Sequence, residues 1–506
     1  MNPNPTLPPG PHPSSGPLPG AGLALGLLLA INLFNYIDRQ VLAAVLPKIK
    51  LDASICEPDD PWLQTKLLML TSAFMWSYML LSPLFGWLGD KLPRWGLVGV
   101  AVIAWSLATG ATGAATGYLM LLFTRCLVGV GEAAYGPVAP AMLSDLYPVE
   151  HRGRTLSWFY MAIPVGSAIG FGLGGAVADT SLGWRGAFHI AMVPGLILGS
   201  LCFFMRDPPR REAPKPNADT SHSYLKVLGE LRRNRSFVLC SAGMTASTFV
   251  LGGVASAIPL YVFEREARFT LDAKAVELTA GVKLSDGRPV VPPEVVDKLR
   301  PIAGAEVMNT AEVQAKLKAA LTDQEFRQYS ATIIEASPAE GSITNGQIGL
   351  IFGGILVIGG LLATLSGGLL GDRLRNRGVK GAYFHVSGWG TIAGWPFFVG
   401  MLFVPFPYAW GLVFCAVFAL FFNTGPANTV LANVTRSSIR ATAFAINILL
   451  IHALGDAISP TIIGVIADKS SLHTAFLAVS FLIPVAGLLW VAGAPHLDAD
   501  TQRAES

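Results

Sequence analysis

Twelve apolar runs, each long enough to cross a lipid bilayer as an α-helix, constrain the fold of this chain more than any other feature. A membrane-spanning helix needs about 20 predominantly apolar residues. The chain is 52% hydrophobic and only 14% charged, a composition that excludes an ordinary soluble protein. We therefore predict an all-α membrane protein with twelve transmembrane helices. The runs lie at residues 22–47, 65–89, 95–115, 118–146, 154–179, 186–205, 236–262, 346–371, 381–404, 408–434, 441–467 and 474–493.

A polar and basic linker over residues 207–235 divides the runs into two groups of six. An internal repeat relates the two groups, because residues 163–179 align without gaps with residues 452–468, and Asp179 aligns with Asp468. Parallel repeats of six helices with a substrate site between them are a transporter architecture. The sequence therefore predicts two six-helix bundles around a central cavity. The other expected parts are a Pro- and Gly-rich tail at 1–20, an N-terminal bundle at 21–206, a C-terminal bundle at 236–493 and a tail at 494–506.

A polar segment of mixed charge at residues 263–345 interrupts the second group, between the seventh and eighth runs. We expect it to form a small external domain or lid, in which residues 311–329 make an amphipathic helix. Lysine and arginine gather in the linker and in the loops on the same side of the membrane. By the positive-inside rule both termini are then cytoplasmic, and we expect an integral multi-pass protein of the cell (inner) membrane.

A carboxylate and a guanidinium lie within the fourth apolar run. Glu132 follows Arg125 by seven residues, which is two turns along one helix face. A charge at the bilayer centre costs about 2.5–3.5 kcal/mol on insertion scales, so such residues indicate function. We expect both side chains to line a polar cavity, where Arg125 attracts an anionic group of the substrate. The alternative is an arginine that anchors backbone carbonyls.

The first apolar run carries a second polar face. Asn35, Tyr36 and Arg39 share this face, and Asp38 lies at its edge. Asp38 fits a coupling proton, because burial favours the neutral acid while the neighbouring arginine favours the carboxylate. Glu132 is the alternative proton site, and the two carboxylates would then titrate as a coupled pair. A structural Asp–Arg pair that holds two helices together is the rival interpretation.

Polar residues of the eleventh run complete the candidate site. His452 and Asp456 are four residues apart and share a helix face, and we place them with Tyr160 at the substrate cavity. The five cysteines lack the spacing of metal ligands, and no nucleophile–base pair or nucleotide loop is evident. We therefore expect no enzyme, no metal, no cofactor other than a transported proton, and no nucleic-acid partner.

The loop after the second run resembles a signature of the major facilitator superfamily. It contains Gly86, Asp90 and Arg94, and the equivalent loop of the second half contains Asp372 and Arg373. The resemblance implies a cytoplasmic latch whose first copy should meet in the outward-facing state and separate in the inward-facing state. In the second copy, an asparagine stands where the first has its arginine. The expected latch residues are Gly86, Asp90, Arg94, Asp145, Arg152, Asp372 and Arg373.

Within that superfamily, the chain resembles the Spinster family of lysolipid transporters. The stretches that carry the resemblance are residues 35–39, 131–135, 139–145, 152–160, 163–167 and 452–460. The resemblance implies the major facilitator fold and a proton-linked or facilitative carrier of sphingosine phosphates or lysophospholipids that works by alternating access. The expected substrate-binding residues are Asn35, Tyr36, Arg39, Arg125, Glu132, Tyr160, His452 and Asp456.

Two other functions remain open from the sequence. One is a proton-linked organic-anion symporter of the same superfamily, in which similar intramembrane charges occur. The other is a receptor or lipid-binding scaffold that uses residues 263–345 as its ligand domain. The expected partners are a small amphiphilic or anionic substrate and membrane lipids, and the expected protein is a monomer.

Overall fold

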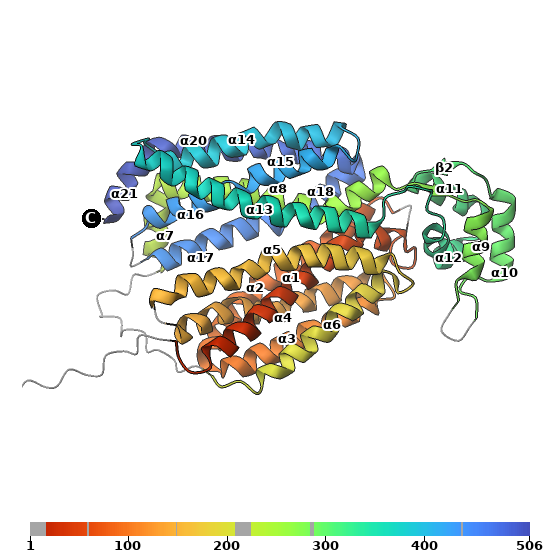
Figure 1. Ribbon diagram of the computed structural model, residues 1–506, viewed down its shortest axis with the longest axis horizontal. Coiled ribbons are helices and arrows are strands. Elements are labelled where there is room, and N and C mark those ends of the chain that lie inside the picture. Colours follow the sequence, from red (N-terminus) through yellow and green to blue (C-terminus); the bar gives the residue numbers. More distant parts are fainter. Residues whose placement is uncertain are drawn as a thin grey trace, which may run out of the picture.

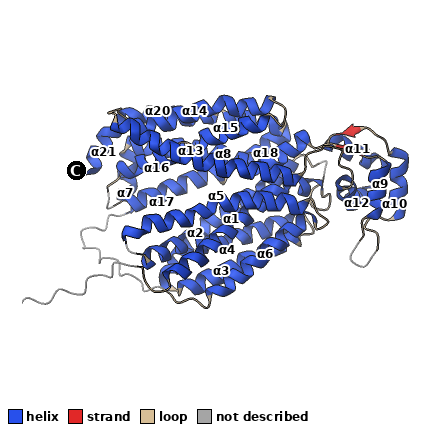
Figure 2. Ribbon diagram, in the orientation of Figure 1, coloured by secondary structure: helices blue, strands red, loops and turns tan. Residues whose placement is uncertain are grey.

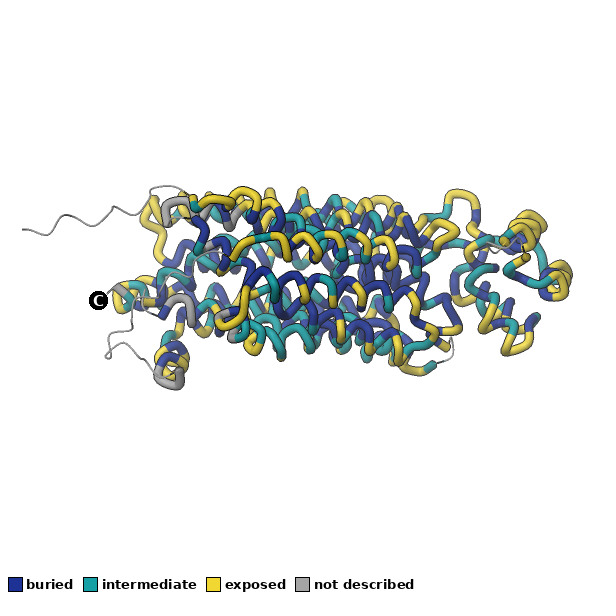
Figure 3. The backbone as a smooth tube through the Cα atoms, turned by 90° about the horizontal axis from the view of Figure 1, so that it is seen from below, coloured by how far each residue is buried: buried dark blue, intermediate teal, exposed yellow. Residues whose placement is uncertain are grey.

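Figure 1 shows a computed structural model of the chain, in which two helical bundles lie side by side and a smaller domain projects from one end. The structure describes residues 17–57, 60–147, 149–207, 224–283, 288–436 and 439–505. Within these described residues, twelve helical segments are long and apolar enough to cross a membrane, as predicted. Large apolar side chains such as Leu119, Phe204 and Leu369 are exposed, as expected for lipid-facing surfaces. Figure 3 shows that buried residues run through the interior of the molecule.

The N-terminal bundle consists of six helices. They are α1 (Ala21–Leu51), α2 (Leu63–Lys91), α3 (Arg94–Gly113), α4 (Tyr118–Leu146), α5 (Val149–Ala178) and α6 (Gly183–Cys202). Helix α1 packs against α5, α2 packs against α4, and α3 packs against both α4 and α6. Glycines of α5 make the first of these contacts close, since a Cβ on Gly170 would lie 2.5 Å from the carbonyl oxygen of Ile37. Small residues at such positions let membrane helices approach each other.

The C-terminal bundle contains six spans, several of them interrupted. Its elements are α7 (Tyr224–Arg233), α8 (Arg235–Glu266), α13 (Asn345–Asn376), α14 (Ala382–Phe403), α15 (Ala409–Phe421), α16 (Thr424–Asn433), α17 (Arg440–Ile451), the π-helical η2 (His452–Asp456), α18 (Ser459–Lys469), α19 (Leu472–Ser480), α20 (Leu482–Gly493), η3 (Ala494–His496) and α21 (Leu497–Glu505). The expected tail after residue 493 thus forms a helix, and Asp500 accepts a hydrogen bond from the backbone N–H of Ser236. This bond fastens α21 to the start of α8.

The insertion between α8 and α13 forms a small helical domain with two short paired strands (Figure 2). Its elements are β1 (Phe269–Thr270), α9 (Ala273–Gly281), α10 (Pro293–Leu299), η1 (Arg300–Ile302), β2 (Val307–Met308), α11 (Thr310–Ala320) and α12 (Asp323–Glu335). The expected single helix at residues 311–329 is wrong, because two helices meet there. Thr322 and Glu325 form a capping box, which starts a new helix.

The two bundles meet mainly at one end of the molecule. We call the end with α7 and α21 the linker end, and the end with the insertion the insertion end (Figure 1). Helix α5 packs against α13, α2 packs against α18, and α1 packs against α8. These three pairs join one bundle to the other.

Two aspartates that are equivalent in the internal repeat fasten this junction. Asp468, in α18, accepts hydrogen bonds from the backbone N–H groups of Gln64 and Thr65 at 2.7 and 2.8 Å. Asp179, just after α5, accepts one from the N–H of Gly346 at 2.7 Å. N–H groups in the first turn of a helix lack intrahelical partners and carry partial positive charge. Each bundle therefore caps a helix of the other, and we call these contacts the reciprocal caps.

Glycine makes the junction of α5 and α13 possible. A Cβ on Gly349 would lie 2.1 Å from the carbonyl oxygen of Phe171, so a larger residue would push the two helices apart. We expect Gly349→Ala to destabilise the protein by about 1–3 kcal/mol, the usual cost of overpacking. The thermal unfolding midpoint in detergent should fall accordingly.

The matched control for this prediction is Gly354→Ala on the same helix. A Cβ on Gly354 would meet nothing within 4 Å, so this variant should keep or slightly raise the midpoint. Equal midpoints for the two variants would contradict the close approach of α5 and α13.

Candidate functional site

A cavity of about 640 Å³ lies between the two bundles. Its lining includes late residues of α2 and α4 (Gly86 and Pro140), early residues of α5 (Phe159), and early residues of α17 (Ala445). All of these lie toward the linker end, so the cavity occupies the half of the molecule opposite the reciprocal caps. Its volume is in the range of small-molecule binding sites.

The two walls of the cavity differ in chemistry. The N-terminal wall carries the charged residues Arg39 and Glu132 beside apolar residues such as Met75, Phe159 and Ile163. Its polar members are Asn32, Asn35, Tyr36, Arg39, Tyr78, Glu132, Tyr135 and Tyr160. The C-terminal wall is apolar except for its last residue and contains Ala445, Ile446, Ile448, Leu449 and His452. A ligand in this cavity therefore meets charge on one side and hydrocarbon on the other.

A buried ion pair dominates the polar wall. The Nε of Arg39 lies 2.7 Å from Oε2 of Glu132, and the two side chains are 15% and 0% exposed. The guanidinium also lies about 5 Å from three aromatic ring centres, those of Tyr36, Phe74 and Tyr78. Such rings attract a cation through their negative faces. The described hydrogen bond uses Nε alone, so the terminal nitrogens of Arg39 have no hydrogen-bond partner within the described part of the chain.

A second pair of charged residues lies behind this wall. Asp38 is buried and accepts a hydrogen bond from the hydroxyl of Thr109. Arg125 is 2% exposed, and its Nη2 donates to the hydroxyl of Thr112 at 2.9 Å. The Nε of Arg125 and the Oδ1 of Asp38 have no hydrogen-bond partner within the described residues. Neither side chain is part of the cavity lining.

The expectation that Arg125 lines the cavity is therefore wrong for this structure. Arg125 does share a helix face with Glu132, but it lies two turns nearer the insertion end. At that depth helices α3 and α6 cover it, and its guanidinium lies 5.2 Å from the ring centre of Phe188. The described hydrogen bond of Arg125 links α4 to α3 through a hydroxyl, so the alternative of an arginine that anchors backbone carbonyls stays a prediction.

Of the two residues predicted in the second half, His452 lines the cavity and Asp456 supports it from behind. His452 lines the cavity, and its Nδ1 lies 3.0 Å from both carboxylate oxygens of Asp456. Asp456 itself packs closely against Gly252 of α8. It orients the imidazole, and it is not part of the lining. Tyr160 lines the opposite wall and is 47% exposed.

The first latch motif makes a contact within one bundle. The Nη1 of Arg94 lies 2.5 Å from Oδ2 of Asp145, and its Nε donates to the carbonyl of Gly89. Both partners belong to the N-terminal bundle, so the pair forms while the cavity occupies the linker-side half. The expected contact between Arg94 and Asp145 is therefore present, and its separation in the inward-facing state stays a prediction. The side chains of Asp90 and Arg152 lie outside the described residues.

The second latch motif makes a comparable contact in its own bundle. Asp372 accepts a hydrogen bond of 2.8 Å from the hydroxyl of Tyr383, and Arg373 is exposed. Gly86 of the first motif lines the cavity. The two motifs thus bring neighbouring helices of one bundle together at the linker end.

The apolar wall of α17 is the part of the site that the sequence analysis did not identify. Leu449, Ile448 and Ala445 lie three, four and seven residues before His452, on the same helix face. Extending the face of His452 toward the N-terminus at helical spacing would have found them. Tyr78 on α2, which was expected near the cavity as one of several aromatic residues, lines it beside Arg39.

Comparisons with known proteins agree with this architecture. A family model described as the Major Facilitator Superfamily matches residues 28–282. Protein spinster homolog 1 of Homo sapiens is 30% identical over 506 residues, which cover 95% of this chain and 81% of the relative. The Xenopus tropicalis protein of the same name is 29% identical over 500 residues, with the same coverage. The crystal structure of a bacterial homolog to the human lysosomal transporter Spinster, inward-facing and unoccupied, matches with a TM-score of 0.70 at 17% identity, over 95% of this chain and 98% of that one.

The fold and the family match define a transporter of the major facilitator superfamily, and not an enzyme. Within that superfamily the chain belongs to the Spinster family. The resemblance found in the sequence motifs is thereby confirmed, as is the integral multi-pass membrane protein. A transporter is also favoured over the receptor or scaffold alternative.

The Arg39–Glu132 pair leads to a test of stability. Arg39→Met leaves Glu132 buried without its partner, so we expect a loss of about 3–5 kcal/mol in the free energy of unfolding at pH 8. The double variant Arg39→Met/Glu132→Leu should recover most of this loss, because no unpaired charge remains. Unfolding of the purified protein in mixed detergent micelles provides the measurement.

Lys298→Gln is the control, since it breaks the exposed Lys298–Glu325 pair of the insertion. Exposed pairs contribute about 0–1 kcal/mol, so its effect should be small. Additive losses from the two substitutions at Arg39 and Glu132 would show that the pair is not energetically coupled.

Proposed function

We propose that this transporter moves a lysolipid or sphingolipid-like amphiphile with an anionic head group by alternating access, and that a proton gradient drives it. The observation that carries the proposal is the two-sided cavity. Arg39, whose terminal nitrogens have no hydrogen-bond partner among the described residues, lines one wall, and α17 lines the other with apolar side chains. A planar guanidinium suits a phosphate, and a hydrocarbon wall suits an acyl or sphingoid chain.

The orientation follows from the positive-inside rule. The basic linker places the linker end in the cytoplasm and the insertion outside, with both termini cytoplasmic. The cavity then belongs to an inward-facing state, and the reciprocal caps close the outer side.

Coupling to protons follows from competition for Arg39. An anionic head group that binds Arg39 replaces Glu132, and the buried carboxylate then loses its charged partner. An unpaired buried carboxylate is more stable when it takes up a proton. Substrate and proton therefore bind together, which is the basis of symport. Glu132 lines the cavity, so it is better placed than Asp38 to exchange this proton.

Asp38 takes part through the second pair of charged residues. It lies one residue before Arg39 on α1, and Thr109 links it to the helix whose Thr112 holds Arg125. Protonation of Glu132 alters the electrostatic field at Asp38, so the two carboxylates titrate as a coupled pair. We retain both as the proton-coupling pair, with Asn35, Tyr36, Tyr160 and His452 at the substrate.

A substrate panel tests the proposed function directly. Proteoliposomes with an imposed pH gradient should accumulate a lysophospholipid or a sphingosine phosphate faster than liposomes without protein. A hydrophilic hexonate should not accumulate, because it cannot use the apolar wall. Accumulation of the hexonate alone would instead identify the organic-anion symporter. If no substrate of the panel accumulates, whichever direction the pH gradient has, the result would contradict the proposal.

The proton-coupling pair has its own test. Glu132→Gln and Asp38→Asn both mimic the protonated acid, so both should bind substrate yet lose accumulation driven by pH. His385→Gln is the control, since His385 lies in α14 and outside the cavity lining. If one variant still accumulates substrate under the pH gradient, the substituted residue does not belong to the proton-coupling pair. If both variants do so, proton coupling at this site is contradicted.

A further inference from the structure

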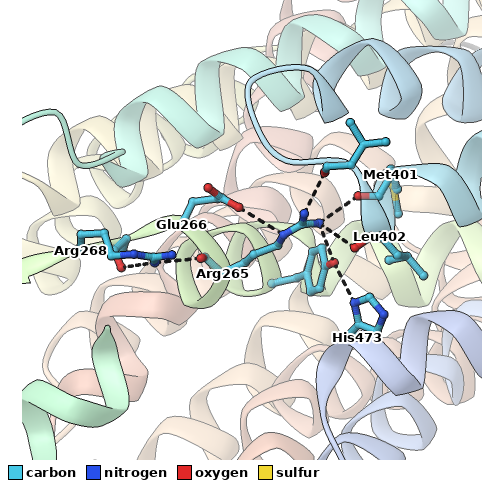
Figure 4. Close-up of polar contacts among 9 residues, drawn as sticks. Arg265, Glu266, Arg268, Met401, Leu402 and His473 are labelled. Atoms are coloured by element: carbon cyan, nitrogen blue, oxygen red, sulfur yellow. Dashed lines mark hydrogen bonds and ion pairs between the residues drawn. The ribbon is translucent and has the colours of Figure 1, made fainter. Parts of the chain in front are cut away.

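The end of α8, from which the insertion starts, is bonded to another helix of the C-terminal bundle. Arg265, in the last turn of α8, donates hydrogen bonds of 2.8–3.0 Å to the carbonyls of Met401, Leu402 and Val404 (Figure 4). These are terminal carbonyls of α14, which lack helical partners and carry partial negative charge. A guanidinium at this place fixes the end of α8 to α14.

The two chain segments that enter and leave the insertion are also bonded to each other. The N–H of Thr270 donates to the carbonyl of Ser337 at 2.8 Å, and the N–H of Ala339 donates to the carbonyl of Arg268 at 2.9 Å. The segments therefore form one stem instead of two independent strands. The insertion should move together with the C-terminal bundle.

Helix α12 of the insertion reaches across to the N-terminal bundle. Glu335 lies 3.4 Å from the ammonium of Lys48 in α1, and Arg327 lies 2.8 Å from Glu57. Lys48 is also 3.5 Å from Asp179, one of the reciprocal caps. One lysine thus joins the junction of the bundles to the insertion.

Lys48 depends on these two partners. Its side chain is only 10% exposed, and a buried ammonium requires opposite charge nearby. Asp52, the next acid along the chain, is occupied by Arg185, Trp184 and Ser54. Burial acts to raise the pKa of Asp52, but the hydrogen bonds from these groups outweigh it and hold that pKa below its usual value.

Opening of the insertion end would separate these contacts. The N-terminal bundle carries Lys48 and Glu57, whereas the insertion travels with the C-terminal bundle. We propose that the insertion is a brace that holds the insertion end closed through Lys48–Glu335 and Arg327–Glu57, and so favours the state with its cavity at the linker end. This inference rests on the alternating access proposed above.

The experiment measures the distance between the bundles at the insertion end. Spin labels are attached to cysteines placed at Ser181 and Ser470, which are exposed on opposite bundles, after Cys126 and Cys415 are replaced by alanine. Glu335→Gln keeps the shape of the side chain and removes its charge. We expect the ratio of long to short distances to rise at least about twofold relative to the labelled protein that keeps Glu335, because the largely buried Lys48 loses one of its two partners.

The matched control is Lys298→Gln, which breaks an ion pair inside the insertion and touches neither bundle. It should leave the distance ratio unchanged. Arg327→Gln is the second variant, and it should shift the ratio in the same direction as Glu335→Gln because it breaks the other crossing pair. Its side chain is 56% exposed, so folding should not suffer.

The outcomes separate the two proposals. Two distance populations in the parent protein support alternating access, and equal ratios in Glu335→Gln, Arg327→Gln and Lys298→Gln would then overturn the brace alone. A single distance under every pH and substrate condition would overturn alternating access and the brace together.

Discussion

The reciprocal caps at the insertion end are the constraint on which the rest of this structure depends. Asp179 and Asp468 each place a carboxylate on the free N–H groups of a helix in the other bundle. Bonds between a charged acceptor and a backbone donor are roughly twice as strong as neutral ones. Because these bonds, with the close approach at Gly349, join the bundles at one end, the cavity lies in the other half.

The division of chemistry between the two bundles follows the same plan. The N-terminal bundle holds both intramembrane arginines and both acids of the candidate site, whereas the facing residues of α17 are apolar apart from His452. An ion pair inside one bundle need not break when the bundles move relative to each other. Only a ligand that contacts both walls, or a proton that binds one of the acids, then changes the relative stability of the two states. A polar and an apolar wall on different moving bodies suit an amphiphile whose two ends are released as the walls separate.

Much of the fold could be predicted from the sequence, whereas only part of the site could. Run lengths gave the twelve spans, and the repeat aligned Asp179 with Asp468 before any contact was known. Helical periodicity placed Arg39 and Glu132 on inward faces, but it reports the face of a helix and not its depth. Arg125 shares the face of Glu132 and still lies behind α3 and α6. The partner of a motif residue depends on tertiary packing that spacing does not contain, and the contact of Arg94 with Asp145 was expected from the family resemblance and not from spacing.

The energetics of the junction explain why a separate domain is suited to adjust it. A transporter must visit both states, so the free-energy difference between them has to stay within a few kcal/mol. Stronger caps would hold one state permanently, whereas an exposed ion pair contributes at most about 1 kcal/mol. The Arg327–Glu57 pair, whose side chains are 56% and 60% exposed, is an interaction of this size. Contacts that are individually weak, and that sit on a body fixed to one bundle by Arg265, change the population of each state without abolishing either.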